Sequence, residues 1–332
     1  MNQRLMRVLA FRSYIGTGAL RGATLAIALL LLLTGRIDVA AQDASPTASA
    51  SRLAALGYPE VRLVATDAGF EAPSEVAAGR SLVVLENRGT PGGPAQISDV
   101  NFIQFPPGIT LDDFNNAFAT PEAGPPDWFG EIVSTGGFYV EASQTGYAVL
   151  DLQPGEWYVG VGDANPFVPL TVTEGGTATP AVGIDPTADV TVAVSEFTID
   201  LPGSIPAGRR VWHVTNAGEQ SHELTLVKTP ELLTVDQVQT IIGLPEGSAL
   251  PPGVPDPARF EFLATGPKTM SAGREIWIEV DLAPGHYVAF CSQPDAATGQ
   301  PHALLGEVAI FTVGESGTPT AGPADAYARR PR

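Results

Sequence analysis

The chain has 332 residues, 18 lysines and arginines against 36 aspartates and glutamates, and a formal net charge of −18. A chain this acidic repels polyanions, so nucleic acid and anionic lipid surfaces are poor partners for it. The apolar share of 44% supplies packed cores and excludes wholesale disorder, and the length predicts about two domains. With 36 glycines, 30 prolines and only 16% charged residues, the composition favours many turns and short strands over long helices.

The N-terminus has the pattern of an export signal. Four arginines between Arg4 and Arg21 precede an apolar run over 23–34, and the small residues Val39 and Ala41 offer a cleavage site before Gln42. The apolar run is too short to cross a bilayer comfortably. We therefore expect residues 1–41 to be a signal peptide, the protein to be extracytoplasmic (secreted, cell-surface or periplasmic), and no membrane span to remain after cleavage. An uncleaved membrane anchor is the alternative.

The rest of the chain contains a duplication. Residues 42–56 are predicted to be a flexible leader, 174–187 a linker and 315–332 a disordered tail, because they are rich in small residues and proline. Between them, residues 57–173 and 188–314 share landmarks, such as two Ala-Gly-Arg turns that begin at Ala78 and at Ala207, an offset of 129. The offset reaches 141 at the last strand, where Leu170-Thr-Val matches Phe311-Thr-Val. A period this long indicates a duplicated domain.

Each copy has the pattern of an all-β domain. Alternating apolar residues, as from Ile276 to Leu282, are typical of strands with one face buried, and Pro-Gly and Ala-Gly pairs mark turns. Thr234 and Gln237 form a capping-box pattern before an apolar stripe that ends at Gly243, which predicts one short helix in a long connection of each copy. Many short strands within a domain of this size indicate a β-sandwich.

The single cysteine is a buried spectator, a free thiol or a metal ligand. Cys291 ends an apolar strand, His302 precedes the last strand, and His222 begins another strand. If these residues converge at one end of the sandwich, a thiolate and two imidazoles form the equatorial set of a copper site. His213 lies within a strand and His286 follows a turn, where we expect it to be solvated, and neither has a partner at ligand spacing.

At these residues the sequence resembles the cupredoxins, the plastocyanin- and azurin-like blue copper domains. The resemblance rests on Asn216-Ala-Gly-Glu-Gln-Ser-His222, on Pro284-Gly-His-Tyr287, on Cys291, and on His302-x₄-Glu307 before a Phe-Thr-Val strand. It implies two tandem cupredoxin-like Greek-key β-sandwiches. It further implies one copper ion in the second sandwich, with His222, Cys291 and His302 as equatorial ligands, and one-electron transfer to an extracytoplasmic redox partner protein.

Two features depart from the family. Gly306-Glu307 stands where the family usually has Gly-Met, the methionine being the weak axial ligand, and the loop from Cys291 to His302 is longer than in plastocyanin or azurin. A longer loop is tolerable because closure cost grows slowly with length. Glu307 at the axial position would favour Cu(II) and lower the reduction potential, or the set would hold zinc instead. Alternatively Glu307 points to solvent and the site is three-coordinate or empty.

The first copy contains no histidine, and we align Ser98 with His222 and Gly162 with Cys291. It is therefore predicted to be a ligandless scaffold or a docking surface. A metal-free interaction protein built from both copies is the alternative to a copper protein. A two-domain copper oxidase or nitrite-reductase-like enzyme needs a second, histidine-rich copper centre, and the chain has only four histidines. We therefore expect no enzymatic activity.

Overall fold

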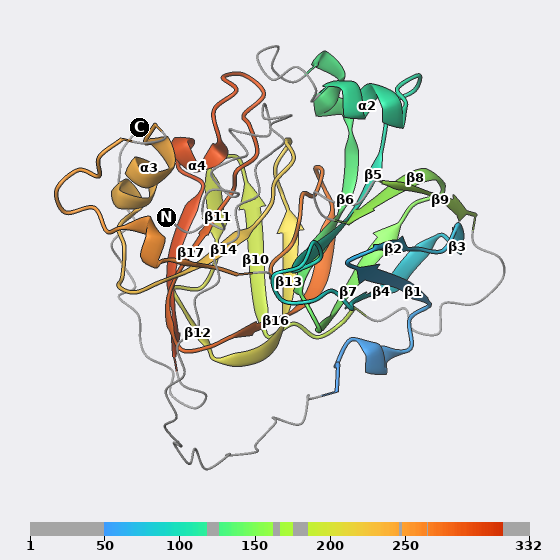
Figure 1. The fold of residues 1–332 in the computed structure, drawn as a ribbon, viewed down its shortest axis with the longest axis horizontal. Coiled ribbons are helices and arrows are strands. Elements are labelled where there is room, and N and C mark those ends of the chain that lie inside the picture. Colours follow the sequence, from blue (N-terminus) through green and yellow to red (C-terminus); the bar gives the residue numbers. More distant parts are fainter. Residues whose placement is uncertain are drawn as a thin grey trace, which may run out of the picture.

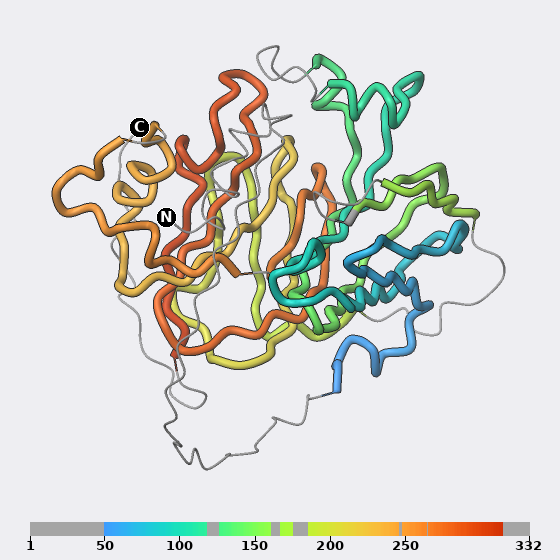
Figure 2. The backbone as a smooth tube through the Cα atoms, viewed as in Figure 1, coloured from blue at the N-terminus to red at the C-terminus, as the bar shows by residue number. Residues whose placement is uncertain are grey.

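The computed structural model describes residues 50–117, 126–161, 167–174, 185–245, 248–263 and 265–314. The predicted signal peptide 1–41 and tail 315–332, together with most of the predicted linker 174–187, lie outside these residues. Within them the fold is all-β, as predicted, and consists of two units that lie side by side (Figures 1 and 2). No helix in the described ranges is long and apolar enough to span a membrane.

The first unit comprises the strands β1 to β9. Four of them form one layer in the order β2-β1-β4-β7, and the other five form a sheet in the order β3-β9-β8-β5-β6. Helix α2 (Leu111–Ala117) follows β5. The strands are β1 (Glu60–Thr66), β2 (Gly69–Glu71), β3 (Glu75–Ala77), β4 (Gly79–Asn87), β5 (Ile97–Gln104), β6 (Val133–Glu141), β7 (Thr145–Leu152), β8 (Gly155–Val161) and β9 (Val168–Thr173), with single 3-10 turns at Ala54–Leu56 and Asp127–Glu131.

The second unit, β10 to β18, repeats this arrangement. Its layers have the orders β11-β10-β13-β16 and β12-β18-β17-β14-β15, with helices α3 (Val235–Gly243) and α4 (His302–Leu305) and a 3-10 turn at Pro257–Arg259. The strands are β10 (Val190–Ser195), β11 (Thr198–Asp200), β12 (Ser204–Pro206), β13 (Gly208–Asn216), β14 (Thr225–Thr229), β15 (Glu261–Phe262), β16 (Glu275–Leu282), β17 (Gly285–Phe290) and β18 (Val308–Gly314).

The registers of the two units reproduce the offsets of the sequence repeat. Ser204 pairs with Thr312 in the second unit, and Glu75 pairs with Thr171 in the first, so the offset is 129 on one strand and 141 on the other. The additional residues lie between β17 and β18 and include α4. The first helix of the second unit begins as predicted, since the Thr234 side chain accepts the backbone N–H of Gln237 in a complete capping box.

The two units share one continuous sheet, which no pattern in the sequence predicts. Strands β7 and β16 pair through Trp277 with Val149 and Ile278 with Ala148, which joins both four-stranded layers into an eight-stranded sheet. A single hydrophobic core then includes residues of both units, such as Leu150 and Ile276. Because edge strands expose unpaired backbone groups, joining two edges removes both from solvent.

Part of the outer face of this sheet is covered, so two expectations need correction. Alternation predicted that only one face of β16 is buried, but Trp277 on the other face is only 2% exposed. It packs in a cluster with Leu53, whose side chain is fully buried. The end of the predicted flexible leader 42–56 is therefore docked: Ser51 Oγ and the backbone N–H of Leu53 donate to Glu279 Oε1 at 2.9 and 3.0 Å. Composition suggested a free tether, but Leu53 supplies an apolar anchor.

Candidate metal centre

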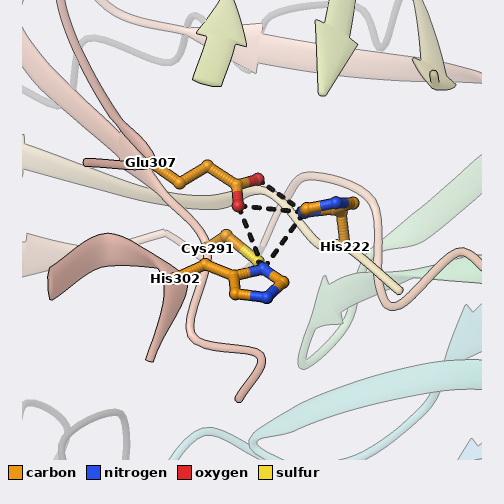
Figure 3. Close-up of side chains that lie close together, drawn as sticks. All are labelled: His222, Cys291, His302 and Glu307. Carbon is orange, nitrogen blue, oxygen red and sulfur yellow. Dashed lines mark hydrogen bonds and ion pairs between the residues drawn. The ribbon is translucent and has the colours of Figure 1, made fainter. Parts of the chain in front are cut away.

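Four side chains from separate parts of the second unit meet at one end of its sandwich (Figure 3). His222 lies between β13 and β14, and Cys291 directly follows β17. His302 is the first residue of α4, and Glu307 directly precedes β18. The structure thus brings together the four residues singled out in the sequence.

Donor atoms of these side chains converge on one point. Nδ1 of His222 and Nδ1 of His302 are 3.2 Å apart, and Cys291 Sγ lies 3.6 Å from His302 Nδ1. Glu307 turns inward: its Oε1 lies 2.9 Å from His222 Nδ1, and its Oε2 lies 3.1 Å from His302 Nδ1. One donor atom from each of the four residues lies within 4.8 Å of the others. These separations are those of atoms that bond one ion at roughly 2.0–2.3 Å.

All four residues are buried, and Glu307 is fully inaccessible to solvent. The alternative in which Glu307 points to water is therefore not the arrangement found. Burying a carboxylate is costly unless hydrogen-bonding or charged partners compensate. Here its partners are the two imidazoles, which places the glutamate among the potential ligands.

Backbone hydrogen bonds fix the long ligand loop. The N–H of Cys291 donates to the Glu307 carbonyl at 3.2 Å, and the N–H of Glu307 donates to the His302 carbonyl at 3.0 Å. The N–H of His302 donates to the Gln293 carbonyl at 2.8 Å, and Pro294 and Pro301 form an isolated bridge within the loop. The additional residues between Cys291 and His302 thus form an ordered hairpin that keeps both donors at ligand distance.

The thiol is in an unfavourable place for a free thiolate. Burial raises the pKa of Cys291 well above its usual value, and the charges of Glu307 and Glu223 raise it further, against smaller lowering effects from the backbone N–H groups of Glu223 and Gln293. Two negative groups that face each other in an enclosed site repel unless a cation lies between them. The donor set therefore fits a metal ion, which ionises the thiol on binding.

A second residue lies beside the Nε2 atom of each imidazole, outside the donor cluster. Neither of these outer partners was predicted from the sequence. His222 Nε2 lies 3.5 Å from Glu196 Oε1, and His302 Nε2 lies 3.4 Å from Gln220 Oε1. An acceptor at Nε2 favours the tautomer whose Nδ1 is free to bind a metal. Gln220 lies two residues before His222 and could have been found from that spacing. Glu196 is far upstream in the β10–β11 turn, and nothing in the sequence pattern connects it to His222.

Backbone N–H groups hold the Glu196 carboxylate in place. Its carboxylate accepts the N–H groups of Glu219 and Gln220 at 2.6 and 2.8 Å. Desolvation alone would raise the pKa of Glu196, but these N–H bonds, with the His222 contact, lower it to about 2. Gly218 leaves the necessary space, because a Cβ there would lie 2.6 Å from Glu196 Oε1. Glu196 is thus an anion held beside a candidate ligand.

The other two histidines of the sequence lie elsewhere. His213 on β13 stacks on Trp277 with ring centroids 4.2 Å apart, and its Nε2 lies 2.9 Å from Glu275. His286 on β17 is part-buried rather than solvated as expected, because it lies within the sheet between β14 and β18.

The first unit keeps the strands but not the donors. The register places Ser98 opposite His222, as aligned, because Asn101 pairs with Gly160 in the way that Thr225 pairs with Phe290. It places Val161 opposite Cys291, where the sequence alignment had Gly162. The offset between the units is 129 at β4 and β13 but 130 at β8 and β17, which accounts for the difference of one residue.

Comparisons with known proteins return copper proteins among the solved structures. Reduced auracyanin from the photosynthetic bacterium Roseiflexus castenholzii is 23% identical over 37% of this chain and 94% of its own, with a TM-score of 0.24. Cu-containing nitrite reductase from Thermus scotoductus is 12% identical over 82% of this chain and 67% of its own, with a TM-score of 0.21. Copper nitrite reductase from Nitrosomonas europaea is 11% identical over 77% and 93%, also with a TM-score of 0.21. No protein-family model and no curated protein matches the sequence.

In its strand order and in its buried cluster of two histidines, one cysteine and one glutamate, the second unit resembles a cupredoxin with a type 1 copper site.

Proposed function

We propose that this chain is an exported copper protein that holds one copper ion in its second unit and carries single electrons. His222, Cys291 and His302 would hold the ion, with the Glu307 carboxylate as a fourth donor. The observation that carries the proposal is the convergence of these four buried donors within 4.8 Å of one another.

The chemistry of the donor set supports copper. A thiolate with two imidazoles suits both Cu(I) and Cu(II), and an ion held on strands and a braced hairpin need not rearrange when its charge changes. The bound ion would supply the redox chemistry, while the protein supplies a water-excluding site and fixes the ligand orientations. A carboxylate oxygen in place of the methionine sulfur stabilises Cu(II), so we propose a reduction potential lower than that of a methionine-ligated site.

The same residues argue against turnover of a substrate. Two of the four histidines face the proposed ion, and His213 is occupied by Trp277 and Glu275. A second copper centre rich in histidine would therefore have only His286 left among the four histidines of the chain. We accordingly propose a redox partner protein outside the cytoplasm, reached after removal of residues 1–41, and no enzymatic reaction.

Metal analysis of the purified protein tests this proposal. We expect close to one copper per chain and a visible absorption band from thiolate-to-copper charge transfer, which Cys291→Ser abolishes. His222→Ala should lose the copper, whereas His286→Ala, a matched change on the strand that leads to Cys291, should keep it. Zinc at full occupancy would overturn the redox role. Absence of metal uptake in both the native protein and the controls would favour the metal-free interaction protein.

A further inference from the structure

A short extended segment, 267–271, lies between β15 and β16 and runs beside His222. The N–H of His222 donates to the Met270 carbonyl at 3.0 Å, and the N–H of Met270 donates to the His222 carbonyl at 2.7 Å. The N–H of Leu224 donates to the Pro267 carbonyl at 3.2 Å. The backbone of His222 is thus paired along one side with this segment, which we call the bracing segment.

The other side of the bracing segment is paired with β6 of the first unit. The N–H of Lys268 donates to the Gly137 carbonyl at 2.9 Å, and the N–H of Ser271 donates to the Ser134 carbonyl at 2.8 Å. Ser134 Oγ donates to the Thr269 carbonyl at 2.6 Å, and its backbone N–H donates to Ser271 Oγ at 2.9 Å. A backbone ladder therefore runs from the first unit, through the bracing segment, to His222.

Side chains fix the register of this ladder. Met270 is fully buried and lies over Gly136, where an added Cβ would be 3.2 Å from Met270 Cγ. Gly136 has φ +103°, a conformation that L side chains rarely adopt. A side chain at this position would both strain β6 and press on Met270, so the glycine allows β6 and the bracing segment to approach closely.

An ion pair across the two units holds the same contact. Lys268 Nζ lies 2.9 Å from Asp99 Oδ2 and 3.0 Å from the hydroxyl of Tyr139, both in the first unit. On the opposite side, the Gln293 side chain of the ligand hairpin donates to Thr269 Oγ1 at 3.1 Å. The bracing segment is therefore attached to the first unit and to two ligand-bearing parts of the second.

We infer that the ligandless first unit positions the metal centre of the second: β6 fixes the bracing segment, and the bracing segment fixes the backbone of His222. Calling His222 a ligand rests on the proposed function, but the ladder itself does not. In this role Ser134 and Asp99 are positioning residues that act through 267–271 without touching the ion.

Two variants of the full chain separate this role from general stabilisation. Ser134→Ala removes a buried hydroxyl from the ladder, and Asp99→Asn removes the charge that holds Lys268. Ser51→Ala is the matched control. The Ser51 hydroxyl also makes two hydrogen bonds: it donates to Glu279 Oε1 on β16 and accepts the N–H of Ala54 in its own segment. It lies on the outer face of the shared sheet, away from the bracing segment.

Hydrogen exchange of the metal-free protein measures the bracing directly. We expect the amides of His222, Leu224 and Met270 to exchange about tenfold faster in Ser134→Ala and Asp99→Asn, because local opening sets their exchange, and to be unchanged in Ser51→Ala. Unchanged exchange at His222 in both variants, or equal acceleration in the control, would overturn the inference. Because Asp99→Asn conserves size at a partly exposed position, it keeps the test valid where Ser134→Ala fails to fold.

Copper titration provides the second readout. We expect Cu(II) affinity to fall several-fold in Ser134→Ala and Asp99→Asn, with a changed charge-transfer spectrum, and to be retained in Ser51→Ala. Faster exchange at His222 with unchanged affinity and spectrum would overturn the positioning role. If no form binds copper while the exchange result holds, the proposed function fails and the ladder stands.

Discussion

Both carboxylate oxygens of Glu307 lie 2.9 Å from Nδ1 of His222, and neither side chain is exposed to solvent. A buried carboxylate therefore lies against the two imidazoles, at the sequence position where the cupredoxins usually have a methionine. A hard oxygen donor stabilises Cu(II) relative to Cu(I), whereas a thioether stabilises Cu(I). With glutamate at this position, we expect the reduction potential to be lower than that of a methionine-ligated site.

Replacing Glu307 with methionine should raise the reduction potential and strengthen the visible absorption. Each tenfold change in the ratio of Cu(I) to Cu(II) affinity is about 59 mV for one electron, and we expect a rise of at least that size. Redox titration of the copper-loaded variant measures it. Glu307→Gln is the control, since it keeps the size and an oxygen donor while removing the charge, and its potential should fall between the two. An unchanged potential in Glu307→Met would show that Glu307 is not a ligand.

Glu196 should matter for metal affinity although it lies beside the far nitrogen of His222 and outside the donor cluster. Removing an outer partner of a metal-bound histidine typically costs 10- to 100-fold in affinity, so we expect Glu196→Ala to weaken copper binding by about that factor. Glu196→Gln retains an oxygen acceptor for His222 Nε2 and should recover part of the loss. Competition with a chelator of known affinity measures all three proteins.

Gly218→Ala tests the same contact without changing the carboxylate. Its Cβ would lie 2.6 Å from Glu196 Oε1 and must displace that group, so the variant should bind copper as weakly as Glu196→Ala. Gly203→Ala, at a glycine whose Cβ would meet nothing within 4 Å, is the control and should bind copper normally. Full affinity in Gly218→Ala would mean that Glu196 does not hold His222 in its binding orientation.

Leu53 should contribute to the stability of the whole molecule, although it precedes the first strand. Its side chain is fully buried on the outer face of the shared sheet, and truncating a buried leucine to alanine costs about 2–5 kcal/mol. We expect Leu53→Ala to lower the free energy of unfolding in urea by an amount in this range. Leu232→Ala, at a leucine that is 57% exposed, should change it by less than about 0.5 kcal/mol. Equal effects would mean that the docked segment adds nothing to stability.

The convergence of the four side chains could be predicted from the sequence because they lie in short local patterns. Cys291 ends an apolar strand, and His302 and Glu307 stand at fixed spacing before the last strand. The repeat then separated the copy with donors from the copy without. Such patterns can be recognised in the sequence because each residue lies next to a strand end, and strand ends at the same edge bring their residues to one end of a sandwich.

Contacts between the two units leave no comparable pattern in the sequence. The pairing of β7 with β16 joins two edges, and alternation along β16 gives no sign that Trp277 is covered by Leu53. The Lys268–Asp99 pair joins residues 169 positions apart, each of which resembles an ordinary surface charge in the sequence. Chemistry that depends on long-range pairing, including the outer partner Glu196, could be found only from the fold.

The final prediction concerns pH. Burial and the neighbouring carboxylates raise the pKa of Cys291 well above its ordinary value, so the metal-free thiol keeps its proton at neutral pH. Metal binds the thiolate, and each ion therefore displaces one proton. Between pH 7.5 and 8.5, affinity for Cu(II) or Zn(II) should rise about tenfold per pH unit and level off only above the thiol pKa. Chelator competition at several pH values measures the slope, and Cys291→Ser, which has no thiol proton to lose, should show almost none. A flat profile in the native protein would mean that the thiolate forms before the metal arrives, against the effect of burial.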